Sequence, residues 1–290
     1  MASNQTPNPR PDADFKLSIT RALADQLQRA LETLTPATLT SQAISELQNR
    51  PGVYALFLDG ERVYVGKASR SLTARLGKHL RKLSGRSGFA NRLTFICLYV
   101  DEDLEASAPE KMLIKAYRTD GGAPWNTNGF GNNDPGKQRD TSRIKANHFD
   151  ALFPINLSLE LSMDDHIIGS SDALTLLTKL KEQLPYLLRY DNARPDVLRK
   201  AGLTIPAGPL KLADWLELLV TNLPSGWQAT ALPGYVIVYP EKDPDRYPSA
   251  ISIWRNESGK LIARAGAAEQ GPSTDENEEW DRLTTDSDDG

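Results

Sequence analysis

The stretch Gly52-Val-Tyr-Ala-Leu-Phe-Leu-Asp-Gly-Glu-Arg-Val-Tyr-Val-Gly66 decides how the middle of this chain folds. Its two halves are rich in β-branched and aromatic residues, which favour strands, and Asp59-Gly60 between them is a strong signal for a two-residue turn. The stretch therefore predicts an antiparallel hairpin. Tyr54 and Tyr64 stand at similar distances from the turn, so we expect them to lie nearly opposite each other and to share one face.

A helix is predicted directly after this hairpin, over residues 72–83, with Ser71 as its cap and Ser84-Gly85 as its stop. At about 100° per residue the leucines of this helix form one stripe, which must face the core. We expect the adjacent stripe, which is basic, to run along the rim of that core. This second stripe consists of Arg75, His79, Lys82 and Arg86.

Beyond a third predicted strand, over 93–100, the sequence indicates another helix that begins at Ser107 and ends near Arg118. Glu110 lies in its first turn, on a face that is otherwise apolar. A carboxylate on such a face is costly unless it is paired or binds a metal, although the helix dipole also favours a carboxylate there. A loop rich in glycine and asparagine follows, and it contains Asn126.

Gly52-Val-Tyr54, nine intervening residues and Tyr64-Val-Gly66 resemble the pair of motifs that defines the GIY-YIG nuclease superfamily. The residues that follow in the order of that superfamily are Arg75, Glu110 and Asn126. The resemblance covers roughly residues 51–128. It implies a three-stranded antiparallel sheet flanked by helices, and a hydrolase that cuts nucleic acid with one divalent metal.

The resemblance also implies roles for residues of the hairpin. Tyr64 would be the general base, helped by Lys67, and Tyr54 would line the site. The chain departs from the family in two places: valine replaces isoleucine in both motifs, and one more residue separates Lys67 from Arg75 than in the excision-repair members. The second departure would shift Arg75 slightly.

The remaining implied roles concern the phosphate and the metal. Arg75 would contact the scissile phosphate, Glu110 would hold Mg²⁺, for which Mn²⁺ can substitute, and Asn126 would anchor the site. His79 stands where many members have tyrosine, and in this it resembles the type II restriction endonucleases of the superfamily. Because an ordinary histidine has a pKa of ~6.5, it is a second candidate for proton transfer. The sequence leaves open whether one of the two tyrosines or the histidine is the base.

The net charge of −4 hides an asymmetry along the chain. Residues 51–150 carry sixteen basic and eleven acidic side chains, a net of +5, whereas residues 266–290 carry one basic and nine acidic, a net of −8. Arg62 to Arg92 includes nine Lys and Arg and no Asp or Glu, which indicates a polyanionic partner, with a solvated helix face as the alternative. The candidate DNA-binding residues in this part are Arg70, Lys78, Lys82, Arg86 and Arg92.

A second basic cluster follows the glycine-rich loop. Its residues are Lys137, Arg139, Arg143 and Lys145. A cationic loop of this kind can enter a groove of double-stranded DNA and read base edges, because arginine pairs with guanine. The alternative is a plain solvated loop.

Composition divides the chain into five parts and predicts the α+β class. Residues 1–14 and the acidic tail, 266–290, are polar, and we expect them to be disordered. Residues 15–50 would form a helical extension, 51–160 the nuclease domain and 165–265 an α+β accessory domain. The elements predicted in the accessory domain are helices over 171–189 and 210–222, and hairpins of 227–232 with 235–240 and of 250–255 with 261–264.

Several classes of protein are disfavoured. No apolar run approaches the ~20 residues that cross a bilayer, and no secretory signal is visible at the N-terminus. The single cysteine, Cys97, cannot form an internal disulfide, and no Cys/His pattern suits zinc. These features predict a cytoplasmic protein without a membrane partner.

Together the motifs and the charge pattern favour a Mg²⁺-dependent, sequence-specific DNA endonuclease of restriction or phage defence. A palindromic site requires two active sites, so we expect a homodimer on double-stranded DNA. One alternative is a repair or mobile-element nuclease that recognises the structure of its DNA. Another is a catalytically inactive domain used for DNA binding or assembly.

Overall fold

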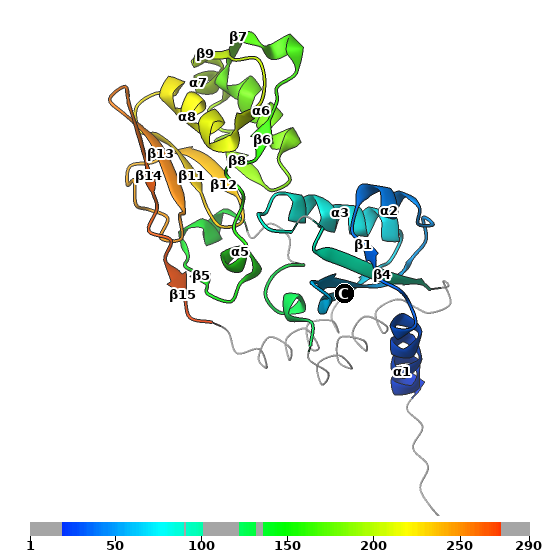
Figure 1. Ribbon diagram of the computed structural model, residues 1–290. Helices are drawn as coiled ribbons and strands as arrows, with labels where there is room; N and C mark the ends of the chain where they lie inside the picture. The colour runs from blue at the N-terminus through cyan, green and yellow to red at the C-terminus, as the bar shows by residue number, and fades with distance from the viewer. Residues whose placement is uncertain (1–18, 90, 101–121, 132–135, 274–290) are drawn as a thin grey trace, which may run out of the picture.

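The computed structural model describes residues 19–89, 91–100, 122–131 and 136–273. The chain is a mixed α+β protein, as the sequence predicts (Figure 1). The predicted helix that carries Glu110 lies outside the described residues, and so does the segment 1–14. Within the described part, no helix combines the length and the apolar character needed to cross a membrane.

The first sheet has four antiparallel strands in the order β1-β4-β2-β3. The strands are β1 (Ala37–Thr38), β2 (Gly52–Leu58), β3 (Glu61–Ala68) and β4 (Leu93–Tyr99). The three predicted strands β2, β3 and β4 are confirmed, but the sheet has one strand more than expected. This extra strand, β1, comes from the N-terminal extension and pairs with β4, so the extension is not only helical.

Helices cover both faces of this sheet (Figure 1). They are α1 (Ile19–Glu32), α2 (Ser41–Ser45) and α3 (Leu72–Ser84). α1 lies on one face, where Leu31 shares a core with Val53, and α2 and α3 cover the other face. The hydroxyl of Ser71 accepts a hydrogen bond from the Ala74 amide at 3.0 Å, which confirms the predicted cap of α3.

A β-bulge at Val63 decides which side chains of β3 face α3. Residues directly opposite in an antiparallel pair point to the same face, and one residue of slippage reverses the face of every later side chain. With the turn at Asp59-Gly60 and no bulge, Tyr64 would lie opposite Ala55 and would point away from Tyr54. Similar distances from the turn therefore do not explain why Tyr54 and Tyr64 share a face.

The observed register shifts by one residue at the bulge, so that Tyr64 pairs with Leu56 and Tyr54 pairs with Gly66. The two tyrosines do share a face, as predicted, but as diagonal neighbours rather than as an opposite pair. Their ring centroids lie 6.1 Å apart. Both rings point toward α3, in the core that α3 shares with the sheet.

The second sheet belongs to the C-terminal part of the chain and has the order β14-β13-β11-β12-β8. Its strands are β8 (Leu188–Tyr190), β11 (Trp227–Ala231), β12 (Val236–Pro240), β13 (Ser252–Glu257) and β14 (Lys260–Ala265). Both predicted hairpins are confirmed, because β11 pairs with β12 and β13 pairs with β14, each antiparallel. β8 joins the sheet in parallel with β12.

The helices packed with this sheet are α6 (Ala173–Gln183), α7 (Pro195–Lys200) and α8 (Leu212–Asn222). The helix predicted over 171–189 is shorter than expected. It begins after Asp172, whose carboxylate accepts a hydrogen bond from the Thr175 amide at 3.0 Å. It ends before Leu184, because a residue that precedes proline, here Pro185, is disfavoured in a helix. The leading residues instead belong to β7 (Gly169–Asp172), which pairs with β9 (Gly202–Ile205).

Short elements make up the rest of the described chain. They are η1 (Pro124–Asn126), η2 (Lys137–Thr141), β5 (Ile144–Lys145), α5 (Phe149–Leu152), β6 (Glu160–Leu161), η3 (Asp165–Ile167), β10 (Leu210–Lys211) and β15 (Gln270–Gly271). β15 pairs in parallel with β5, so the expectation that disorder begins at residue 266 is wrong for the described start of the acidic tail. The C-terminal core also begins earlier than residue 165, because it includes Ile155.

Candidate functional site

Three side chains from β2 and α3 form a hydrogen-bonded chain on one face of the first sheet. Arg75 Nε donates to Tyr54 Oη at 3.2 Å, and Tyr54 Oη lies 2.7 Å from His79 Nε2. A guanidinium can only donate, so Tyr54 Oη accepts from Arg75. In the hydrogen bond between Tyr54 and His79, the tautomer of the imidazole decides which of the two groups donates.

Tyr64 completes the group from the neighbouring strand. Its ring centroid lies 5.3 Å from that of His79, in an edge-on arrangement. Phe130 closes the group from the loop after η1: its ring stacks on His79 at 4.9 Å and meets Tyr64 edge-on at 5.0 Å. Tyr54, Tyr64, His79 and Phe130 are all buried, whereas Arg75 is half-buried and gives the group its opening to solvent.

The surroundings of His79 keep its imidazole neutral. Burial, and after it the positive charges of Arg75 and Lys82, lower the pKa of His79 to about 3. The pKa of Arg75 moves the other way. Its burial would lower this pKa, but the oxygens of Tyr54 and Tyr64 outweigh burial and raise it, so the guanidinium stays charged. The site therefore pairs a fixed positive charge with an uncharged imidazole.

Both motif glycines are required by close packing. A Cβ on Gly66 would lie 2.3 Å from Tyr54 Oη and 2.4 Å from Tyr54 Cζ, inside the phenol itself. A Cβ on Gly52 would lie 2.2 Å from the carbonyl oxygen of Leu98 on the adjacent strand. Neither glycine has a positive φ, so what they supply is space for a neighbouring group.

Asn126 pairs with the open edge of β3. Its Oδ1 accepts from the Val65 amide at 2.9 Å, and its Nδ2 donates to the Val65 carbonyl oxygen at 2.7 Å. One side-chain amide thus makes both hydrogen bonds that a further strand would make at this residue. Asn126 thereby holds η1 against the strand that carries Tyr64.

The expectation that the basic stripe of α3 runs along an exposed rim is wrong. His79 and Arg86 are each only 5% exposed, and Arg75 and Lys82 are half-buried. The reason is a cover of four aromatic residues from the segment after β4, which packs over this stripe. The residues of this aromatic cover are Trp125, Phe130, Phe149 and Phe153.

Lys82 and Arg86, two of the candidate DNA-binding residues, contact this aromatic cover. Lys82 Nζ donates to the carbonyl oxygen of Phe130 at 2.6 Å and lies over the rings of Phe130 and Phe149. Arg86 Nη1 donates to the carbonyl oxygens of Phe153 and Pro233. With so little exposed surface, Arg86 cannot offer its guanidinium to a phosphate in this conformation.

The other expected site residues take varied positions. Arg70 and Lys78 are exposed, and Arg92 is exposed but makes a two-pronged ion pair with Asp59.

Lys67 pairs with Val53 in the register, so it stands on the face of the sheet away from the two tyrosines. It is therefore not brought together with Tyr64. All four residues of the second cluster are exposed; they are Lys137, Arg139, Arg143 and Lys145.

Glu110 lies outside the described residues. Among the residues that are described, no group of three or more His, Cys, Asp and Glu side chains could hold a metal.

Phe130 is a site residue that the motifs in the sequence did not indicate. The signal that could have identified it is an aromatic residue placed between two glycines, Gly129 and Gly131, in a loop rich in glycine and asparagine.

The arrangement can bind an anion and move a proton. A charged guanidinium beside phenol oxygens stabilises negative charge, and a neutral imidazole is hydrogen-bonded to one of these phenols. No protein-family model matches the chain, and no curated protein matches it either. The resemblance stated above therefore rests on the two motifs, on the order of the residues that follow them, and on this geometry.

Proposed function

We propose that this protein is a Mg²⁺-dependent endonuclease of the GIY-YIG type that hydrolyses phosphodiester bonds in DNA. The observation that carries the proposal is the convergence of Tyr54, Tyr64, Arg75 and His79 on one face of the first sheet. We further propose that it acts as a sequence-specific type II restriction enzyme in phage defence. A homodimer would then supply the two sites that a palindromic sequence requires.

Hydrolysis of a phosphodiester needs a base for the attacking water and positive charge for the extra negative charge on phosphorus. Arg75 is half-exposed and charged, so we assign it to the phosphate. Tyr54 Oη is already engaged by Arg75 and by His79, so we assign it to orienting the guanidinium. The proton transfer is assigned to Tyr64, as the resemblance implies. His79 acts through Tyr54 as a positioning residue.

The metal is assigned to Glu110 on the resemblance alone. Mg²⁺ is commonly held by one or two carboxylates together with phosphate oxygens and waters, so it does not need a cage of protein ligands. Bound there, it would stabilise charge on the phosphate and on the leaving oxygen. The proposal assigns the role of the metal to no described residue.

Cleavage of DNA by matched tyrosine variants tests the proposal. Tyr54→Phe keeps the ring and removes only the hydroxyl that joins Arg75 to His79, so cleavage of plasmid DNA with Mg²⁺ should fall by about 100-fold or more. Tyr190→Phe, in the second sheet, is the control and should cleave like wild type. Arg75→Ala and Glu110→Ala should also lose nearly all cleavage while they still bind DNA. Wild-type cleavage by these two variants would show that the site is wrongly assigned.

The form of the products separates the proposed function from its alternatives. Discrete fragments from mixed-sequence DNA would support a restriction enzyme. Smeared products, or cutting confined to branched DNA, would support a repair or mobile-element nuclease. Binding without cutting, with Mg²⁺ and with Mn²⁺, would support an inactive DNA-binding or assembly module.

A further inference from the structure

The ring of Phe130 contacts two residues of the candidate site at once. It stacks on the imidazole of His79, with the two planes 19° apart and the ring centroids at 4.9 Å. It meets the ring of Tyr64 edge-on, with the planes 74° apart and the centroids at 5.0 Å. Stacked and edge-on arrangements are the ones that aromatic pairs prefer. A single side chain thus contacts two of the three residues that the sequence left open as the base.

Phe130 is itself held by contacts that involve neither His79 nor Tyr64. The residue is only 1% exposed and packs on the rings of Trp125 and Phe149, each with its centroid 4.8 Å away. Its amide donates to Asn128 Oδ1 at 3.3 Å, and its carbonyl oxygen accepts from Lys82 Nζ at 2.6 Å. The ring therefore has a fixed place against which other side chains can be aligned.

The rings of His79 and Tyr64 need such a partner to keep one orientation. In both residues the torsion that turns the ring is soft, with a broad range of low-energy angles. The hydrogen bond between His79 Nε2 and Tyr54 Oη, at 2.7 Å, holds one atom of the imidazole but does not by itself set the plane of the ring. A flat ring stacked on the imidazole restricts this rotation, and the edge contact restricts the ring of Tyr64 in the same way.

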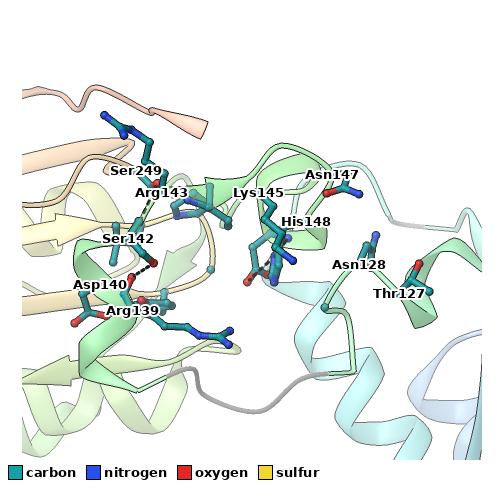
Figure 2. A pocket seen from close by; sticks show the side chains of 17 residues that line it. Thr127, Asn128, Arg139, Asp140, Ser142, Arg143, Lys145, Asn147, His148 and Ser249 are labelled. Carbon is teal, nitrogen blue, oxygen red and sulfur yellow. Dashed lines mark hydrogen bonds and ion pairs between the residues drawn. The ribbon is translucent and has the colours of Figure 1, made fainter. Parts of the chain in front are cut away.

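The residue before Phe130 must be a glycine. Gly129 has a φ of +87°, which side chains rarely adopt, and a Cβ there would lie 2.2 Å from His148 Nε2. The segments that carry Asn128 and His148 run next to each other (Figure 2), and the Phe149 amide donates to the Asn128 carbonyl oxygen at 2.6 Å. Close packing and backbone conformation therefore both require glycine at the turn that leads into Phe130.

Gly131, on the other side of Phe130, brings the backbone up to Tyr64. A Cβ on Gly131 would lie 3.1 Å from Tyr64 Oη, which is tighter than an ordinary contact. Its φ is not positive, so what this glycine supplies is space. The same short segment thus places a ring against His79 and Tyr64 and a backbone beside the Tyr64 hydroxyl.

We infer that Phe130 is a positioning residue of the candidate site, which sets the planes of the His79 and Tyr64 rings while Gly131 limits the position of the Tyr64 hydroxyl. Because the ring of Phe130 is buried, it acts through these two residues and not by contact with DNA. A displacement of about 1 Å can lower a rate by about 100-fold, so a residue that touches no substrate can still control a reaction. The part that concerns proton transfer by Tyr64 rests on the proposed function, whereas the part that concerns His79 does not.

Two variants with the same substitution separate positioning from packing. Phe130→Leu keeps an apolar side chain in the core but removes the flat ring. Phe89→Leu is the matched control, because Phe89 is also buried and belongs to the same core. Within the described part of the chain, the rings that Phe89 contacts are those of Trp125, Phe149 and Phe153. A role in packing alone would give the two variants the same properties.

A third variant acts on Tyr64 and leaves the ring of Phe130 in place. Gly131→Ala puts a methyl group next to Tyr64 Oη and so crowds this hydroxyl. Position 131 is exposed and its φ is not positive, so the variant should fold. Thermal melting checks all three variants, and Gly131→Ala decides the question alone if Phe130→Leu does not fold.

The first measurement does not depend on cleavage. ¹⁵N NMR of the His79 imidazole in the full chain, titrated between pH 4 and 7, reports the pKa of this group. The described charged and titratable groups around it belong to Tyr54, Tyr64, Arg75 and Lys82, and all three variants keep them. Burial lowers the pKa of His79 to about 3, so loss of the covering ring in Phe130→Leu should raise this pKa by about one unit or more. Phe89→Leu should titrate like wild type.

The second measurement is the kinetics of DNA cleavage with Mg²⁺. We expect kcat to fall by about tenfold or more in Phe130→Leu and in Gly131→Ala, because the groups that react are displaced. KM for DNA should stay within about twofold of wild type, since no substitution removes a side chain that is proposed to hold DNA. Phe89→Leu should cleave like wild type.

The comparison of Phe130→Leu with Phe89→Leu decides the inference. It is overturned if the two variants agree in the pKa of His79 or in kcat, and a wild-type kcat in Gly131→Ala would overturn it as well. If wild type cleaves no DNA, the proposed function falls, and the NMR comparison still decides whether Phe130 positions His79. If wild type cleaves DNA while the two variants agree in both measurements, the proposed function stands and only this inference falls.

Discussion

His79 lies on the buried stripe of α3 together with Leu72, Leu76 and Leu83, at a position where the helix faces the core. A histidine is tolerated there because it can remain neutral and still form a hydrogen bond with the buried hydroxyl of Tyr54. The same burial determines its chemistry. An imidazole that is uncharged throughout the physiological range cannot repel Arg75, four residues earlier on the same helix.

Stability should depend on pH through His79. Its folded pKa of about 3 lies below the ordinary value of 6.5, so between these values the unfolded chain binds a proton that the folded chain does not. The stabilisation is therefore present above pH ~6.5 and is lost as the pH falls, by up to ~1.4 kcal/mol per pH unit. Denaturant unfolding between pH 5 and 7 measures it.

His79→Gln should remove this dependence, because glutamine can still form a hydrogen bond with Tyr54 but does not titrate. His166→Gln, at an exposed position, should keep the wild-type slope. Equal slopes for wild type and His79→Gln between pH 5 and 7 would show that His79 is not held neutral by its surroundings.

At the scale of the element, β3 illustrates how an edge strand is fixed in place. The bulge at Val63 brings Tyr64 onto the face of Tyr54, and Asn126 then closes the open edge next to it, at Val65. A bulge and an edge are both places where strand register is weakly specified. The two hydrogen bonds of the Asn126 side chain therefore fix the position of β3 just beyond the bulge.

Loss of the Asn126 amide should therefore affect β3 before the rest of the chain. Asn126→Ala leaves the Val65 amide and carbonyl without partners, which should lower the free energy of unfolding by about 1–3 kcal/mol. Hydrogen exchange should accelerate at Val65 more than along β2. Asn192→Ala, at an exposed position of the C-terminal part, is the control. Unchanged exchange at Val65 in Asn126→Ala would contradict the role assigned to this amide.

At the scale of the whole molecule, α3 joins the two parts of the chain. Arg75 lies in its first half and His79 near its middle, and Arg81 and Arg86, in its last turn and just after it, contact distant segments. Arg81 donates to the carbonyl oxygens of Glu182 and Leu184, at 2.8 and 3.0 Å. Arg86 reaches the carbonyl oxygen of Pro233 at 2.8 Å. One helix and the turn that follows it thus connect the candidate site to the second sheet.

The buried ion pair of Arg86 should be essential to this junction. Arg86→Met removes the arginine that pairs with Asp150 and leaves the carbonyl groups of Phe153 and Pro233, part-buried and buried, without this donor, which should cost about 3–5 kcal/mol. The melting temperature should fall by on the order of 10 °C in calorimetry. Arg92→Met is the matched control, since it also breaks an arginine–carboxylate pair, but an exposed one. Equal melting of the two variants would show that the junction does not depend on Arg86.

Much of the local structure could be predicted from the sequence. The strands on each side of Asp59-Gly60, the length of α3 and its cap at Ser71 all follow from residues within a few positions of one another. So do the two hairpins of the second sheet. Apolar periodicity, turn residues and caps act between near neighbours in the chain, so the sequence displays them directly.

The sequence by itself determined the strands β2, β3 and β4, the helix α3 and the two hairpins of the second sheet, and which residues were candidates for the site. Only the tertiary structure decided that Tyr64 turns toward Tyr54, that His79 is buried and neutral, and that Arg86 faces inward. The physical reason is distance along the chain: Arg86 finds one of its partners at Pro233, 147 residues away, and the ring that covers His79 comes from Phe130. Burial, register and pKa depend on such partners, which local periodicity does not reveal.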